Sequence, residues 1–281
     1  GDLGALPAEL AVRLLAEVAA GLPREAARWN EAVACRLVHQ FREDEADALA
    51  PPARSSRSLF PVDDLGPGDH AGSSPIPPTR RSHLLHHAIE TLCEHLYNPG
   101  PRRFWQGPGD DRGARSPAAL LASVAASNRL DTIMQQADRL ATLGGAAAIQ
   151  VHVDPIAPAN VDTNAAWPRG CIELYLFGPD EFAVWTAPED PVTPIAICTR
   201  SGDDSHGGAR FQLWTREEWY LLQTDGHGTT KPELIDSGEN PYAGLPFSFV
   251  WYQTPVTSFW PAAPGRPLLA AGREIDRSLS R

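Results

Sequence analysis

The sequence contains no uninterrupted run of 18 apolar residues, so it predicts no membrane-spanning helix. Its first residues lack a basic segment followed by an apolar one, and a secretory signal is therefore not expected. Cysteine is scarce, and Cys35, Cys93, Cys171 and Cys198 lie far apart without a Cys-x-x-Cys pair. Each falls in or directly beside an expected helix or strand, which indicates reduced thiols in a cytosolic setting and argues against a disulfide framework or a zinc cage.

Motifs for phosphate binding and nucleophilic catalysis are also missing. Gly144-Gly145 follows an expected helix and precedes an expected strand, the reverse of the order in a dinucleotide-binding fingerprint. No Gly-x-Ser-x-Gly nucleophile elbow and no His-Glu-x-x-His metal motif occurs. The sequence therefore predicts no catalytic residue, no bound cofactor and no metal ligand, and we do not expect an enzyme.

Basic residues are too few for a nucleic-acid-binding protein. The 281-residue chain has 24 lysine and arginine residues against 35 aspartate and glutamate residues, a formal net charge of −11, and Lys231 is its one lysine. A surface this acidic does not hold nucleic acid tightly by neutralising phosphates. It is compatible with a passage through which DNA slides without sticking.

The sequence begins with helical patterns. Residues 7–21 carry an apolar stripe that ends at a glycine, and a second helix is expected from Pro23. Residues 43–80 start with an acidic patch and are then rich in Pro, Ser, Gly and Arg, which predicts a long loop or arm, either docked on a neighbouring subunit or disordered. A third helix is expected over residues 81–97, and the longest helix over residues 117–143.

From Ala146 onward the apolar period becomes two, which is typical of strands. Turn-forming residues separate short runs, as in antiparallel sheets. The expected strands span residues 146–153, 172–177, 182–186, 193–199, 210–215, 219–224 and 247–252. A last helix is expected from Gly265. Helices first, an antiparallel β region second and the start of a helix last predict an α+β fold.

The third helix holds the densest group of candidate ligands. It carries His83, His87, Glu90 and Glu94 on one face, with His86, Cys93 and His95 nearby. Two histidines one turn apart, followed by a carboxylate, can bind zinc. An apolar stripe of Leu85, Ile89, Leu92 and Leu96 lies on another face. A solvated or inter-subunit surface is therefore the favoured interpretation of the polar face.

Two hairpin tips pair an acid with a histidine. Asp203 and His206 lie in one tip, and Asp225 and His227 lie in the other. General acid–base catalysis needs a cleft and a third orienting group, which a tip does not offer, so plain turns are the favoured interpretation.

The tryptophans in expected strands include Trp214, Trp219 and Trp251. Tryptophans in strands are more often core or interface anchors than an open platform for stacking bases or sugars. We therefore expect them to pack inside the protein or against a neighbour.

The stretch from Asn240 to Trp260 joins the β region to the last helix. It opens with a turn marked by Asn240-Pro241, Gly244 and Pro246, continues as an aromatic strand, and leaves through further prolines. We interpret this stretch as the junction around which the chain is organised.

The order of these elements resembles phage portal proteins, the head–tail connectors of tailed phages. Four pieces carry the resemblance: the helix from Ser82 that ends in Tyr-Asn-Pro-Gly-Pro, the long helix followed by Gly-Gly and a strand, the strand and turn Ile172–Phe182, and Asn240–Phe247. The last is similar to the family's Asn-Pro-Tyr-Gly-x-x-Pro turn, with Ala243 as an added residue. The resemblance covers the layout of residues 80–281, and the first 80 residues have no counterpart.

The chain divides into four expected parts. The residue pattern predicts an N-terminal helical pair over residues 1–42 and an arm or linker over residues 43–80. The resemblance implies the organisation of the remaining residues. Residues 81–254 would form a wing-like α+β domain, and residues 255–281 the junction and the start of a stem-type helix. The family's stem, clip, tunnel loop and crown would follow that helix.

The resemblance also implies a structural role as a portal subunit in a homo-oligomeric ring of about twelve copies at one capsid vertex. The implied partners are the major capsid protein, the terminase, a head–tail adaptor, and double-stranded DNA that passes through the channel without sequence-specific binding; no membrane is involved. The implied location is the virion, with assembly in the host cytoplasm. Two other functions stay open: a small hydrolase using His83, His87 and Glu90 or the Asp203–His206 loop, and a binding module with exposed aromatic side chains.

Overall fold

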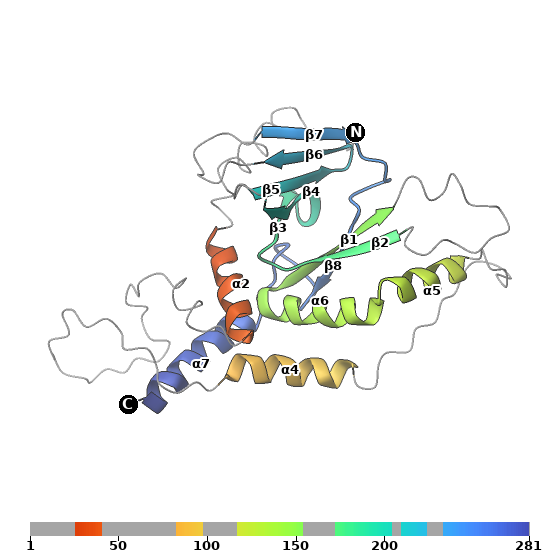
Figure 1. The fold of residues 1–281 in the computed structure, drawn as a ribbon. Coiled ribbons are helices and arrows are strands. Elements are labelled where there is room, and N and C mark those ends of the chain that lie inside the picture. Colours follow the sequence, from red (N-terminus) through yellow and green to blue (C-terminus); the bar gives the residue numbers. More distant parts are fainter. Residues whose placement is uncertain are drawn as a thin grey trace.

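The computed structural model describes residues 26–40, 83–97, 117–153, 172–203, 209–223 and 233–280 (Figure 1). Within these ranges the chain forms helices first, two antiparallel sheets next and a helix last, which confirms the α+β class. The expected helix 7–21 and the arm 43–80 lie outside the described residues. None of the described helices is long and apolar enough to cross a membrane.

The elements follow the expected order closely. The helices are α2 (Ala26–His39), α4 (Leu84–Tyr97), α5 (Pro117–Ser127), α6 (Leu130–Gly144) and α7 (Gly265–Ser280). The strands are β1 (Ala146–Val153), β2 (Ile172–Phe177), β3 (Phe182–Ala187), β4 (Asp190–Asp203), β5 (Ala209–Thr215), β6 (Glu218–Gln223), β7 (Glu233–Glu239) and β8 (Phe247–Trp251). Sheet A has the strand order β2-β1-β8, and sheet B has the order β3-β4-β5-β6-β7.

Sheet A lies between the helices and sheet B because its central strand, β1, is apolar on both faces. Successive side chains of a strand point to opposite faces. Ala146 and Ala148 pack into a core with sheet B, whereas Ala147 and Ile149 pack against α6. The molecule therefore has three layers in the order helices, sheet A, sheet B (Figure 1).

The core between the two sheets is aromatic. Phe259 lies with its ring centroid 4.9 Å from that of Phe249, and Trp260 lies 5.0 Å from Phe182. Such edge and tilted contacts add to the free energy gained by removing large rings from water. Trp214 is 5% exposed and belongs to the same core, which confirms its interpretation as a core residue.

Helices α2, α4, α6 and α7 share a second core. Its buried members are Ala34, Cys35, Leu37, Leu85, Ile89, Cys93, Leu143 and Leu269. Figure 1 shows α4 running beside α6, with α2 crossing them and α7 pointing away from the sheets. Residues far apart in the sequence therefore hold one helical layer together.

The longest expected helix is in fact two helices, so the prediction of one element over residues 117–143 is wrong. The break lies at Asn128 and Arg129, where Arg129 has a φ of 51°. The side chain of Asn128 donates to the carbonyl of Ile172 at 2.8 Å and accepts from the backbone N–H of Leu174 at 2.9 Å. It thus pairs with the outer edge of β2, as a neighbouring strand would.

Replacing Asn128 with alanine should destabilise the protein by about 1–2 kcal/mol, because β2 loses a donor and an acceptor at once. Ser127→Ala is the matched control, since the Ser127 hydroxyl is exposed and donates only to the nearby carbonyl of Val124. Urea unfolding of the two variants measures the difference. Equal stability of Asn128→Ala and the wild type would contradict the bridging role of Asn128.

Candidate functional site

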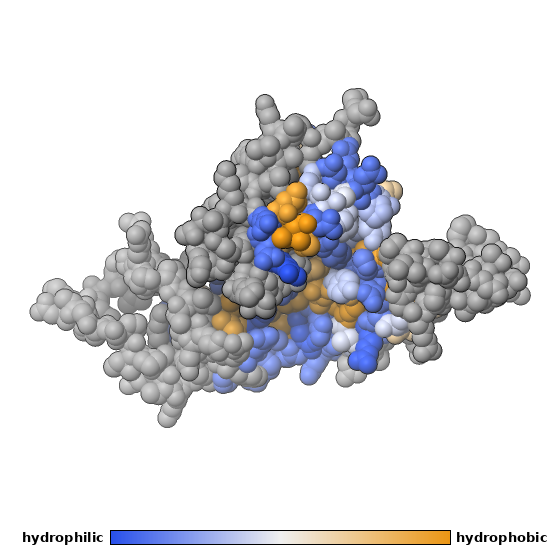
Figure 2. Space-filling view, turned by 45° about the horizontal axis from the view of Figure 1, so that its top comes forward, coloured by the Kyte–Doolittle hydropathy of each residue, from blue (hydrophilic) through white to orange (hydrophobic). Residues whose placement is uncertain are grey.

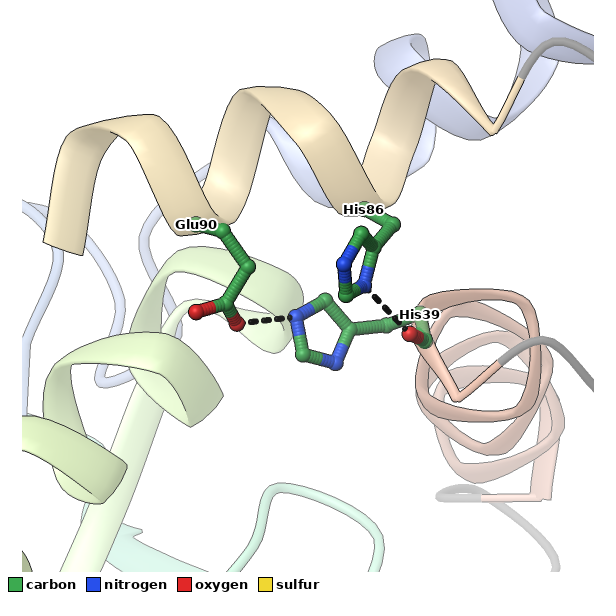
Figure 3. Close-up of side chains that lie close together, drawn as sticks. All are labelled: His39, His86 and Glu90. Atoms are coloured by element: carbon green, nitrogen blue, oxygen red, sulfur yellow. Dashed lines mark hydrogen bonds and ion pairs between the residues drawn. The ribbon is translucent and has the colours of Figure 1, made fainter. Parts of the chain in front are cut away.

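The polar face of α4 meets the end of α2. His86 and Glu90 on α4 lie next to His39, the last residue of α2 (Figure 3). Among the described residues, these three are the one group of histidines, cysteines and acids whose potential ligand atoms all lie within 4.8 Å of one another. His83 and His87 are not part of it, and His87 is exposed.

The sequence pattern does not indicate His39, and its placement of Glu90 on a solvated face is wrong. The solvated interpretation holds for His87 and Glu94, which are exposed, but it is wrong for Glu90, which packs against α2. The reason is that the apolar stripe of α4 was misassigned. Leu92 and Leu96 are 47% and 64% exposed. The buried side of the helix is formed by Leu85, Ile89 and Cys93, and it turns the adjacent His86 and Glu90 toward α2.

Hydrogen bonds connect the cluster to three helices. His39 Nε2 lies 2.9 Å from Glu90 Oε1. His86 Nδ1 lies 2.8 Å from the backbone carbonyl oxygen of His39. Arg139 on α6 donates through Nε to Glu90 Oε1 at 2.9 Å and through a terminal nitrogen to Glu90 Oε2 at 2.8 Å. Glu90 is therefore the shared acceptor of α2 and α6.

The acceptors fix the protons of both imidazoles. A carbonyl oxygen and a carboxylate can only accept, so the proton lies on Nδ1 of His86 and on Nε2 of His39. Burial lowers the pKa of His39, although Glu90 acts in the opposite direction. The hydrogen bond from Arg139 holds the pKa of Glu90 below its usual value. The resting site thus pairs a neutral imidazole with an ionised carboxylate.

The cysteines of the described residues take no part in such chemistry. Cys35, Cys93 and Cys198 are free and buried, and Cys171 lies outside the described part of the chain. Burial raises the pKa of Cys35 to about 12 and also raises the pKa of the other two thiols. Protonated thiols are poor nucleophiles and poor metal ligands.

Of the two hairpin-tip pairs, the structure describes only the backbone of Asp203. His206, Asp225 and His227 lie outside the described residues. Those interpretations therefore stay predictions.

The junction at Asn240 is a second polar centre, with structural contacts in several directions. The side-chain nitrogen of Asn240 donates to the carbonyls of Thr215, Arg216 and Gly244 at 2.9, 3.2 and 3.0 Å. Its side-chain oxygen accepts from the backbone N–H of Tyr242 at 2.9 Å. One amide thus closes the turn and ties it to the β5–β6 hairpin of sheet B.

Tyr242 extends this junction to sheet A. Its hydroxyl accepts from the backbone N–H of Val153, at the end of β1, at 3.0 Å. Its ring lies 6.0 Å from that of Trp214. The turn therefore bridges the two sheets immediately before the chain enters β8 and, after it, α7.

No protein-family model and no curated protein matches the chain. The geometry of the two centres is therefore the basis for assigning a function.

Proposed function

We propose that the protein is a portal subunit, a structural part of the ring through which a tailed phage packages and ejects its DNA. The junction at Asn240 carries this proposal. It connects sheet B to sheet A and then directs the chain into α7, in the order expected for a peripheral β domain that leads to channel-forming helices. The resemblance in layout described above supports the same role.

The exposed sheet edge supports a role in assembly. Strand β7 is the last strand of sheet B, and its Leu234 and Ile235 are 54% and 46% exposed. An edge strand with exposed apolar side chains favours contact with another chain. Among the coloured residues of Figure 2, many are hydrophilic, and a compact apolar patch lies between them on the sheet B side. A neighbouring subunit in a ring would cover such a surface.

The charge of the chain suits a DNA passage. A net charge of −11 in each subunit repels phosphate and allows sliding without a tight complex. The proposed partners are the major capsid protein, the terminase, a head–tail adaptor and double-stranded DNA in transit. The proposed location is the portal vertex of the virion.

The first test is the oligomeric state. We expect the native protein to form a closed ring of about twelve copies with cyclic symmetry. Light scattering coupled to size exclusion gives the mass, and negative-stain images show whether the particle is a ring. A strictly monomeric protein at all concentrations and salt conditions would overturn the proposal.

A further inference from the structure

We propose that His39, His86 and Glu90 bind a divalent transition-metal ion, for which zinc is the best chemical match. Their potential ligand atoms lie within 4.8 Å of one another. In a tetrahedral site with Zn–N and Zn–O bonds of about 2.0–2.2 Å, neighbouring donor atoms lie about 3.3 Å apart. Small torsional changes in three side chains are enough to close this difference.

The ligand set is typical of zinc. Two imidazoles and one carboxylate provide three protein ligands, and water completes the tetrahedron. The cluster lies in a partly shielded place, with His39 14% and Glu90 27% exposed, so an ion can enter without unfolding the helices. The sequence pattern favours a solvated or inter-subunit face for the histidines of α4, and it does not point to this ligand set because His39 comes from another helix.

The outer contacts of the site also suit a metal. His86 donates from Nδ1 to the carbonyl of His39, and this bond leaves an unprotonated Nε2 to face the ion. On binding, the proton of His39 shifts from Nε2 to Nδ1, and the ion replaces it in the contact between Nε2 and Glu90. Figure 3 shows both rings and the carboxylate on facing sides of the two helices.

Arg139 opposes the metal and thereby makes the proposal testable. Its guanidinium forms two hydrogen bonds with Glu90 and partly neutralises the negative charge that would attract a metal ion. Arg139→Gln should therefore strengthen metal binding by several-fold, although it removes an ion pair. If these side chains had only a structural role, Arg139→Gln would show no such gain, because there would be no metal affinity to increase.

A bound ion would link α2 to α4, which lie about 50 residues apart in the sequence, from His39 to Glu90. Because the unfolded chain does not hold these ligands together, binding favours the folded state. Zinc should therefore raise the melting temperature of the protein. This effect is independent of ring formation, since all three ligands come from one chain.

The experiment uses the full chain, freed of metal with EDTA and then titrated with Zn²⁺ in a calorimeter and with Co²⁺ in a spectrophotometer. We expect one ion per chain, a visible Co²⁺ absorption band and a higher melting temperature with zinc. His86→Gln and Glu90→Gln should each weaken binding at least tenfold. His87→Gln, on the exposed side of the same helix, is the matched control and should bind like the wild type.

Circular dichroism of the metal-free variants shows whether they are folded, and a variant that fails is replaced by His39→Gln. The proposal is overturned if the wild type binds no stoichiometric ion, or if His87→Gln weakens binding as much as His86→Gln does. Binding that is unchanged in all of the ligand variants would also overturn it. A ring that binds no metal would overturn only the metal-site proposal, and a monomer that binds one ion would overturn only the portal proposal.

Discussion

Replacing Gly265 with alanine should detach helix α7 from the helical layer. Gly265 is the buried first residue of α7, and a Cβ atom added there would lie 2.1 Å from the carbonyl oxygen of Leu143 and 2.8 Å from its carbonyl carbon. Both atoms belong to the backbone of α6, so no side-chain rotation relieves the overlap. Either α7 moves away or the end of α6 is distorted.

The expected cost is about 3 kcal/mol, at the upper end for overpacking, because backbone has to move. Alanine normally stabilises a helix by about 1 kcal/mol relative to glycine. A loss of stability in Gly265→Ala would therefore point to the overlap with α6. Urea unfolding measures the loss of stability, and limited proteolysis shows whether the segment before α7 becomes accessible. If Gly265→Ala proved more stable than the wild type, the close approach of α6 and α7 would be wrong.

Gly244→Ala is the matched control. The sequence pattern makes Gly244 part of the turn that organises the junction, but a Cβ at this position meets nothing within 4 Å. Its φ also lies outside the left-handed region, so alanine fits without strain. We expect wild-type stability for this variant, since Asn240, with its three donated hydrogen bonds, closes the turn. Under the proposed function, Gly265→Ala should impair ring formation and Gly244→Ala should not.

The strands of the core could be predicted because their side chains alternate or are continuously apolar. The predicted ranges of β1 and β2 agree with the structure, and those of β3, β5, β6 and β8 differ by at most one residue at an end. Strand β7 was missed for a physical reason. Its sequence, Glu-Leu-Ile-Asp-Ser-Gly-Glu, is mostly polar because it lies at the edge of sheet B with nearly all of its residues exposed. Because both of its faces are exposed, β7 has no buried side to impose an apolar pattern.

The break between α5 and α6 could not be predicted from local sequence. Asn128 and Arg129 are tolerated in a helix, and the apolar pattern continues on both sides. The break depends on the bonds of Asn128 to Ile172 and Leu174, which come more than 40 residues later. A tertiary contact thus overrides helix propensity at this point.

The candidate site was only half predictable for the same reason. His86 and Glu90 stand one turn apart on α4, which is visible in the sequence. His39 and Arg139 reach them from helices about 50 residues away in either direction, and nothing in their own surroundings marks them. Only the packing of α2 and α6 on α4 shows that the four side chains meet.

A second large effect is expected where α2 meets the turn between β2 and β3. Arg36 forms an ion pair with Asp180 at 2.5 Å, and the Asp180 side chain is 2% exposed. Arg36→Leu would leave a buried carboxylate without its charged partner. We expect a loss of about 3 kcal/mol, at the lower end for a broken buried pair because Arg36 itself is 35% exposed. Urea unfolding at neutral pH measures this loss.

Arg266→Leu is the matched control on the same helix layer. Arg266 pairs with Glu31 of α2 at 3.0 Å, but the Arg266 side chain is 80% exposed. A surface pair of this kind contributes about 0.5 kcal/mol or less, so the control should be nearly as stable as the wild type. Equal losses in the two variants would contradict the distinction between the buried pair and the exposed one.

The loss of stability in Arg36→Leu should depend on pH through the carboxyl group of Asp180. Burial raises the pKa of Asp180, while Arg36 lowers it, so removal of Arg36 should raise this pKa further. A carboxyl whose pKa is higher in the folded state binds protons more tightly there, and stability then falls as the pH rises through that pKa. The loss of stability in Arg36→Leu should therefore be largest at neutral pH and shrink as the pH falls toward 3.8, the ordinary pKa of an aspartate carboxyl.

Adding Asp180→Asn to Arg36→Leu removes the buried charge, so the double variant should recover stability at neutral pH and lose this pH dependence. A double variant no more stable than Arg36→Leu would show that the lost packing of Arg36, and not the unpaired charge of Asp180, causes the defect.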